Sequence, residues 1–256
     1  MSFWAQKKQA TYGFFVLLFL VVVVSIPAYY TFFHHAPTCF DGIQNQGEEG
    51  IDCGGPCTKV CAPEAQPPIV HWQLFFKVTD GVYNVVANVE NPNTGVYATD
   101  VPYTFRLYDD NNVEIADRTG TAFMLPNAVF PIFEGGLMTG ERVPVRATFE
   151  FDGTPSWQKK PYVLPRLVVI DQTLSGSSTP RVDATIQNTE DYDVSNIEVV
   201  SVIYDADGNA IAASDTLVDH IAAQSSQDVV FTWPQPFTEP VSKILITPKI
   251  APRFDL

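Results

Sequence analysis

The residues best suited to specific chemistry lie between Cys39 and Cys61. All four cysteines of the chain fall in this segment, at positions 39, 53, 57 and 61, which gives the spacing C-x13-C-x3-C-x3-C. An even number of cysteines in a segment too short to bury a core indicates two disulfides in an oxidising compartment, with three pairings open. Structural zinc is the competing interpretation, but the paired C-x2-C arrangement typical of zinc sites is missing.

Oxygen-bearing side chains recur every three or four residues in the same segment, at Asp41, Asn45, Glu48 and Asp52, with glycines between them. Ca²⁺ takes about six to eight oxygen ligands from carboxylates, amides and carbonyls, so these four residues are candidate calcium ligands. The alternative is that they form Asx turns and left-handed turns in a disulfide-bonded loop. The sequence leaves both interpretations open.

The pattern C-x-DG-x-x-N-x-x-E-x-G-x-DCGG-x-C runs from Cys39 to Cys57. It resembles a short Cys-rich motif found in many bacterial and archaeal surface proteins. This resemblance implies an exported surface protein more firmly than it implies a metal.

Patterns that commonly mark catalytic sites are missing from the sequence: G-x-S-x-G, H-E-x-x-H, a Walker loop and G-x-G-x-x-G. Ser214, Asp219 and His220 are the residues from which a catalytic group could be imagined. Neighbours in an extended chain rarely point at one another, so we predict that the protein is not an enzyme.

Composition excludes nucleic acid as a partner and favours folded domains. The chain has 256 residues and a formal net charge of −14, with 15 basic residues against 29 acidic ones, whereas phosphate binding needs clustered Lys and Arg. Apolar residues make up 46% of the chain and charged residues 17%, which is enough apolar material for hydrophobic cores.

The apolar run from Tyr12 to Phe33 contains no charged residue and is long enough to span a bilayer. Lys7 and Lys8 precede it, so the positive-inside tendency predicts a cytoplasmic N-terminus and an extracytoplasmic remainder. A cleavable signal peptide ending near Pro27 is the alternative. The length of the run favours an uncleaved signal anchor, and Pro27 should kink or terminate the helix near its outer end.

Short alternating segments separated by turn residues fill the rest of the chain and predict an all-β fold of two tandem immunoglobulin- or fibronectin-like β-sandwiches. The expected organisation is a cytoplasmic N-terminus at 1–10, a transmembrane signal anchor at 11–33, a Cys-rich disulfide segment at 34–62, a Pro-rich linker at 63–69, and β-sandwich modules at 70–164 and 165–256.

The two modules match each other in sequence. Residues 87–91 align with 184–188 at an offset of 97 positions, and residues 107–109 align with 203–205 at an offset of 96. In each copy a strand ends in Tyr-Asp, followed by Asn, Asp or Gly residues suited to a tight hairpin turn.

Residues Phe105 to Asp109 carry the FxLYD signature, and Ile203 to Gly208 form a partial second copy in which Ser201 replaces the phenylalanine. The chain resembles FxLYD domains and the immunoglobulin-like domains of the late-embryogenesis-abundant type. The resemblance implies binding or structural roles, not catalysis. We expect Tyr108 and Tyr204 to be structural, with each ring packed on a core and each hydroxyl bonded to a turn.

Matching Val143 with Val229 lowers the offset to 86 and implies an insertion of about ten residues in the first module. The inserted loop is apolar, and its candidate partner-binding residues are Phe130, Ile132, Phe133, Leu137 and Met138. One interpretation is an exposed patch for a protein partner or for self-association. The other is a loop that packs on its own sandwich or on the second module.

Together these features predict a membrane-anchored, extracytoplasmic structural or interaction protein of the cell envelope. The membrane is the one expected partner for which the sequence identifies the contacting segment, residues 11–33. An accessory subunit of a membrane-spanning complex and an exported enzyme with a site not visible in sequence are the alternatives.

Overall fold

The computed structural model describes residues 3–33, 37–61, 64–159 and 163–251. These described residues form one helix and twelve β-strands, and the chain divides into two compact units, Met1–Cys57 and Thr58–Leu256. Strands dominate the second unit, so the predicted all-β class is confirmed.

Helix α1 spans Phe3–Phe33 and carries apolar side chains on every face of its central part. Within it, the 20 residues Thr11–Tyr30 are apolar enough to cross a membrane, and none of them is buried against protein. At about 1.5 Å per residue such a stretch matches the roughly 30 Å hydrocarbon core of a bilayer. The helix continues past Pro27 to Phe33, so this proline does not terminate it.

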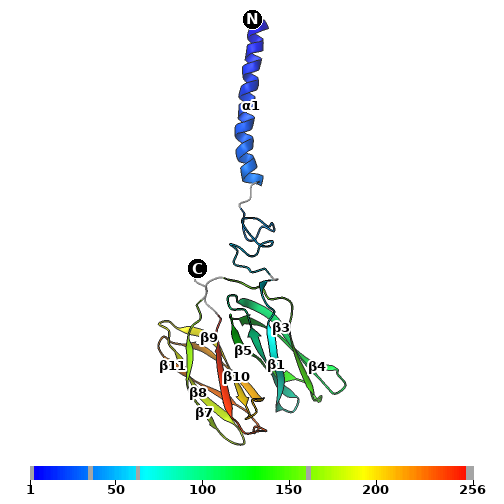
Figure 1. The fold of residues 1–256 in the computed structure, drawn as a ribbon, viewed down its shortest axis with the longest axis vertical. Helices are drawn as coiled ribbons and strands as arrows, with labels where there is room; N and C mark the ends of the chain where they lie inside the picture. The colour runs from blue at the N-terminus through cyan, green and yellow to red at the C-terminus, as the bar shows by residue number, and fades with distance from the viewer. Residues whose placement is uncertain (1–2, 34–36, 62–63, 160–162, 252–256) are drawn as a thin grey trace. The chain divides into compact units, whose positions relative to one another are not determined.

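The first module is a sandwich of two three-stranded antiparallel sheets, with strand orders β1-β2-β5 and β4-β3-β6. Strands β1, β3, β4 and β5 of this module are labelled in Figure 1. Its strands are β1 (Ile69–Thr79), β2 (Val82–Asn91), β3 (Ala98–Tyr108), β4 (Glu114–Met124), β5 (Ala128–Met138) and β6 (Arg146–Phe151). Side chains from both sheets meet in one core, in which Phe105 and Leu107 of β3 face Val85 and Val89 of β2.

The second module repeats this arrangement with sheets β7-β8-β11 and β10-β9-β12. Its strands are β7 (Leu167–Ser175), β8 (Arg181–Asn188), β9 (Val194–Tyr204), β10 (Ala210–Ile221), β11 (Ser226–Thr232) and β12 (Lys243–Lys249). Val182 and Ile186 of β8 pack with Ile197 and Ile203 of β9 in a separate core. The sequence repeat is therefore also a repeat of topology.

The strand pairing shows that the predicted ten-residue insertion is wrong. Ala87 lies opposite Ile132 on β5, and its match Ala184 lies opposite Val229 on β11. Ile132 and Val229 are 97 positions apart, which is the offset of the two alanines. Val143 belongs to the connection after β5 and is not the equivalent of Val229.

The sixth strand of each module, β6 and β12, also keeps the offset of 97 positions. Arg146 on β6 lies opposite Tyr108, and Lys243 on β12 lies opposite Tyr204, so the two basic residues are again 97 positions apart. The modules therefore have nearly equal length, and the apolar segment 128–138 is a regular sheet strand rather than an inserted loop.

A buried asparagine closes one end of each sandwich. The Asn91 side chain is fully buried, and its Nδ2 donates to the carbonyl oxygens of Val96 at 2.9 Å and Leu125 at 3.0 Å. In the second module the Nδ2 of Asn188 donates to the carbonyl oxygen of Ile221 at 3.1 Å, and Ile221 aligns with Leu125. The same amide thus joins the end of the second strand to the end of the fourth in both copies.

Replacing this amide should destabilise the sandwich. Asn91→Ala leaves two carbonyl acceptors without their donor, so we expect the free energy of unfolding to fall by about 1–3 kcal/mol. Denaturant unfolding of the full chain measures the change. Asn88→Ala, at a half-buried position of the same strand, is the matched control and should change stability by less than about 0.5 kcal/mol. Equal losses in the two variants would contradict this role of Asn91.

Candidate functional site

The Cys-rich segment contains disulfides, as predicted. Cys39 is bonded to Cys57, with the two Cα atoms 5.6 Å apart. Cys53 and Cys61 are also disulfide-bonded, and none of the four cysteines, all of which lie in the described residues, is free. We refer to residues 37–57 as the knot.

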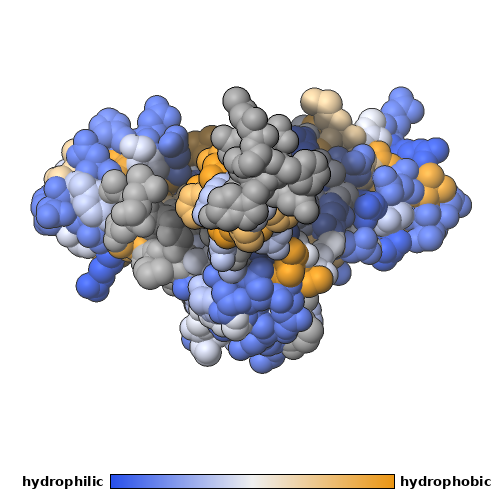
Figure 2. Space-filling model, turned by 90° about the horizontal axis from the view of Figure 1, so that it is seen from above, coloured by the Kyte–Doolittle hydropathy of each residue, from blue (hydrophilic) through white to orange (hydrophobic). Residues whose placement is uncertain are grey.

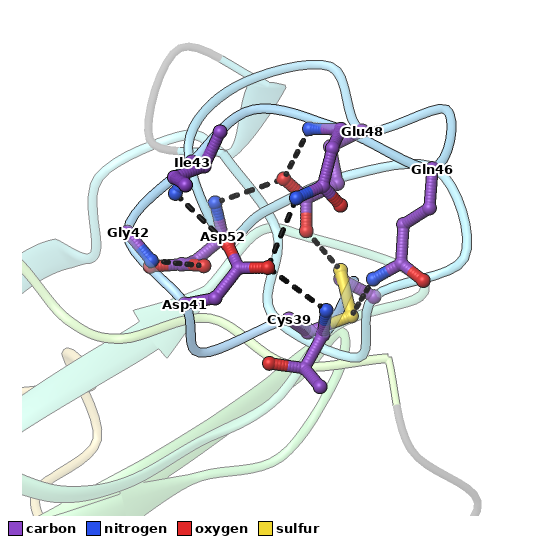
Figure 3. Close-up of a disulfide and its surroundings, with 10 residues drawn as sticks. Cys39, Asp41, Gly42, Ile43, Gln46, Glu48 and Asp52 are labelled. Carbon is purple, nitrogen blue, oxygen red and sulfur yellow. Dashed lines mark hydrogen bonds between the residues drawn. A yellow bond between two sulfur atoms is a disulfide. The ribbon is translucent and has the colours of Figure 1, made fainter. Parts of the chain in front are cut away.

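The acidic side chains of the knot accept hydrogen bonds from its own backbone (Figure 3). The Asp41 carboxylate accepts from the backbone N–H of Thr38 at 3.0 Å and of Ile43 at 2.9 Å, and from Asn45 Nδ2 at 2.9 Å. The bond from the Asn45 amide is the main reason why the pKa of Asp41 is lowered. The Asp52 carboxylate accepts twice from the Gly42 N–H, at 3.0 and 3.1 Å.

Glu48 lies at the centre of the knot and is only 7% exposed. Its Oε2 accepts from the N–H groups of Asn45 and Asp52, both at 3.3 Å, while its Oε1 lies 3.1 Å from Cys57 Sγ. A disulfide sulfur has no proton to donate, so this last approach is a packing contact. The carboxylate therefore links the turns of the knot to its disulfide.

The four candidate calcium ligands form the turn network expected of the alternative interpretation. Asp41, Glu48 and Asp52 all direct oxygens at N–H donors of the knot, while Asn45 Oδ1 is buried and has no hydrogen-bond partner. In the described part of the chain, Cys39, Glu48 and Cys57 are the group close enough to share a metal, but the two sulfurs are bonded to each other. Calcium binding stays a prediction.

The two hairpin tips have the same hydrogen bonds. Asp109 Oδ1 accepts from the N–H groups of Asn111 at 3.0 Å and Val113 at 2.9 Å. Asp205 Oδ1 accepts from those of Asp207 at 2.9 Å and Asn209 at 2.8 Å. The aspartate of each Tyr-Asp pair is thus a turn former.

The tyrosine of each Tyr-Asp pair lies beneath a basic side chain. The Arg146 guanidinium lies 4.1 Å from the centre of the Tyr108 ring, and Lys243 Nζ lies 5.7 Å from the centre of the Tyr204 ring. Both rings are therefore in cation–π contact, which adds to the structural role expected from sequence.

Strand β5 contains the candidate partner-binding residues, and the structure buries four of the five. Phe130, Ile132, Phe133 and Leu137 are between 1% and 8% exposed, and only Met138, at 79%, is open to solvent. The interpretation of these residues as an exposed patch is therefore wrong. Phe130, Ile132 and Leu137 pack into the core of the first sandwich, and Phe133 packs against residues of the second, so the alternative of packing on the two sandwiches is the one observed.

Phe133 belongs to an apolar cluster between the two modules, which we call the junction. Phe133 of β5 and Val86 of β2 pack against Val200, Val202 and Ala213 of β9 and β10. Trp72 extends the junction on one side and approaches the Tyr204 ring edge-on, with the ring centres 6.5 Å apart. The two sandwiches therefore belong to one compact unit.

A polar cluster lies beside the junction. Tyr103 Oη donates to Glu134 Oε1 at 2.9 Å, and burial, followed by the nearby Glu134 carboxylate, raises the pKa of Tyr103. Lys249 Nζ pairs with Glu198 Oε2 at 2.8 Å. Burial and the charge of Glu198 also raise the pKa of Asp215.

A hollow of about 430 Å³ opens between the two modules. Its apolar lining includes Phe123, Leu125, Val129, Leu164, Pro248 and Ile250. Pockets at domain boundaries commonly bind ligands through a few convergent polar groups. Here the charged lining residues are Arg166 and Lys249, and Lys249 is already paired with Glu198.

Ser214, Asp219 and His220, the residues from which a catalytic group could be imagined, are not brought together. Ser214 and His220 are six positions apart on the single strand β10, which separates them by about 20 Å. Asp219 and His220 are both exposed and lie on opposite faces of the strand.

Hydrophilic residues cover most of the face of the chain seen in Figure 2, and the hydrophobic areas visible there are small.

Comparison with known proteins identifies no family. No family model matches the chain, and no curated protein matches it. Among solved structures, it is similar to red sea bream transglutaminase, at 12% identity and a TM-score of 0.26, over 72% of this chain and 29% of that one. A β-glucuronidase of glycoside hydrolase family 2 aligns at 12% identity and a TM-score of 0.21, over 66% of this chain and 24% of that one.

A third structure, the β-glucuronidase of Ruminococcus gnavus, aligns at 11% identity and a TM-score of 0.15, over 67% of this chain and 35% of that one. The chain thus spans about a third or less of the length of these proteins. TM-scores this low carry no argument about shared fold or activity.

A methyl group at Gly55 should disturb disulfide formation in the knot. Gly55 has a φ of +53°, and an added Cβ would overlap the Gly47 carbonyl oxygen. We expect Gly55→Ala to contain thiols that can be alkylated, measured by intact mass, whereas the wild-type chain contains none. Gly47→Ala is the control, because Gly47 also has positive φ, at +89°, but has open space around it. Equal alkylation of both variants would mean that the overlap is unimportant.

Truncating Phe133 should separate the unfolding of the two modules. Loss of a buried Phe ring commonly costs about 3–5 kcal/mol, and here the loss falls on the junction. We expect Phe133→Ala to split one calorimetric unfolding transition into two. Met138→Ala, on the same strand but exposed, should leave the profile unchanged. A single transition at the wild-type temperature in Phe133→Ala would show that the junction does not couple the modules.

Proposed function

We propose that this chain is a single-pass membrane protein whose extracytoplasmic part is a non-catalytic structural or interaction element of the cell envelope. The observation that carries the proposal is helix α1, in which none of the residues Thr11–Tyr30 is buried. An apolar helix without a protein partner has a large unfavourable contact with water, and a bilayer removes that contact.

Two further observations support the orientation. The basic residues Lys7 and Lys8 precede the apolar run, which favours a cytoplasmic N-terminus. The disulfides begin at Cys39, six residues after the helix ends at Phe33. Disulfides persist in oxidising compartments, so the residues after the helix belong outside the cytoplasm.

The proposal that the extracytoplasmic part is non-catalytic rests on the hydrogen bonds that its polar side chains form. Asp109 and Asp205 close hairpins, and Asn91 and Asn188 join strand ends. These side chains stabilise the sandwiches rather than converge on a cleft. The repeated Tyr-Asp hairpins support a relationship to FxLYD-type domains, for which binding and structural roles are expected.

The junction supports a function in which the two modules keep a fixed orientation relative to each other. An apolar cluster that includes Phe133, Val200 and Val202 replaces the flexible contact usual between tandem domains. A rigid pair of sandwiches can present both surfaces to one partner at the same time.

Calcium at Asp41, Asn45, Glu48 and Asp52 is part of the proposal as a structural ion of the knot. The support for it is the buried, unpaired Oδ1 of Asn45 and the oxygen-rich composition of the loop. Its function would be to stabilise the turns next to the membrane.

Charging the helix should abolish membrane retention. Arginine near the middle of a membrane-spanning helix costs about 2.5–3.5 kcal/mol per residue on insertion scales. We expect the wild-type chain to stay with the membrane after alkaline carbonate extraction, and the double variant Val21→Arg, Val22→Arg to be released.

Val21→Leu, Val22→Leu is the control and should be retained. Intact mass of the wild-type protein provides the second measurement. A mature chain that starts near Tyr29 and appears in the soluble fraction would show that the helix is a cleaved signal peptide.

A further inference from the structure

The large apolar side chains of the knot all face outward. Phe40 is 85% exposed, Ile43 is 62% exposed and Ile51 is 61% exposed. These are the Phe and Ile residues of 37–57, a part of the chain that the structure describes throughout. Isolated exposed apolar residues are common on protein surfaces, but three in so small a segment are not explained by its own packing.

Hydrogen bonds join the turns that carry these side chains. The Gly42 N–H donates to the Asp52 carboxylate, so Ile43 and Ile51 are each one residue from the same contact (Figure 3). Phe40 is two residues before Gly42 and directly follows the disulfide-bonded Cys39. The three side chains therefore project from a cross-linked framework and not from a free tail.

Three carboxylates of the knot accept hydrogen bonds from its own backbone. Asp41, Glu48 and Asp52 accept N–H groups of the knot itself, so their carboxylates are turned toward its backbone. Among the acidic residues of the knot, Glu49 is the exposed one. Carboxylates held in this way oppose contact with a lipid surface less than freely hydrated ones would.

The length of the connecting chain limits what can lie next to these side chains. Helix α1 ends at Phe33, and Phe40 follows seven residues later. Seven residues span at most about 25 Å even when fully extended. If the apolar part of α1 fills the hydrocarbon core, the lipid headgroup layer is the surface within reach of the knot.

We propose that the knot rests on the outer surface of the bilayer that holds α1, with Phe40, Ile43 and Ile51 inserted at the boundary between headgroups and acyl chains. This inference rests on the proposed membrane anchor. Apolar side chains of interfacial segments enter the bilayer by about 5–10 Å, which a side chain of this size can reach from a knot lying on the surface. The exposed apolar residues thereby leave water, and the disulfide-bonded framework holds them at a fixed depth.

Depth-dependent fluorescence quenching tests the proposal on the full chain. The variant carries Phe40→Trp as reporter and Trp4→Phe to remove the tryptophan before the helix. It is reconstituted in phosphatidylcholine vesicles with bromine atoms near the top of the acyl chains. We expect the emission attributable to residue 40 to fall by roughly half or more relative to unbrominated vesicles, because the ring lies at the brominated depth.

Two controls make the outcome specific. The parent Trp4→Phe protein with Phe40 intact measures quenching of Trp72, Trp157 and Trp233, which is subtracted. Adding Ile43→Ser and Ile51→Ser to the reporter should reduce its quenching at least severalfold, since the remaining contacts that hold the knot on the lipid are lost. Intact mass with alkylation confirms that each variant keeps its disulfides.

Flotation of the vesicles separates this inference from the anchor on which it rests. Protein that floats with the vesicles while residue 40 is not quenched overturns the placement of the knot and leaves the anchor intact. Equal quenching with and without the two serines also overturns it, because the knot is then held near lipid by its tether alone. Protein that does not float overturns the anchor and the placement together.

Discussion

Two of the four sheets have buried apolar side chains on both faces, and this constraint determines how residues 69–249 are organised. In β2, Val85, Ala87 and Val89 point into the first sandwich, whereas Val86 points to the junction. In β9, Val199 and Ile203 point into the second sandwich, and Val200 and Val202 point to the junction. Successive side chains of a strand face opposite sides, so a strand with large apolar residues at successive positions needs cover on both sides. Each sandwich provides that cover for the other.

The knot satisfies a different constraint, since it has too few residues to form a hydrophobic core. Covalent bonds and backbone-directed carboxylates replace apolar packing there. The Cys39–Cys57 bond and the buried Glu48 hold the turns together, and Asp41 and Asp52 close individual loops. This arrangement leaves Phe40, Ile43 and Ile51 outside, where a larger domain would have buried them.

The helix, the knot and the sandwiches thus differ in what surrounds their apolar side chains. The sandwiches bury theirs within protein, the helix leaves its apolar side chains uncovered by protein, as a membrane span would, and the knot lies between the two along the chain. The repeated use of an equivalent asparagine and aspartate in both sandwiches fits a duplicated module whose polar side chains stabilise the fold. The function proposed above, holding or presenting a rigid surface at a membrane, agrees with this arrangement.

Much of this organisation was predictable from the sequence. The helix follows from an uncharged apolar run, because no other common structure satisfies the backbone of such a segment in lipid. The disulfides follow from four clustered cysteines, and the hairpins follow from Tyr-Asp pairs before Asn, Asp or Gly. The repeat itself follows from the offset of 96 or 97 positions, which the strand register then confirms.

The position of β5 was decided only by the tertiary structure. Phe130, Ile132 and Phe133 are apolar in succession, and a strand buried on both faces has the same sequence pattern as an exposed apolar loop. Which of the two forms depends on what lies opposite, and the partners Ala87 and Val200 are about 45 and 70 positions away in the chain. Sequence by itself determined which segments are apolar and which residues turn the chain. Only long-range pairing, through strand register and the contact between the two sandwiches, decided which of those apolar side chains are covered.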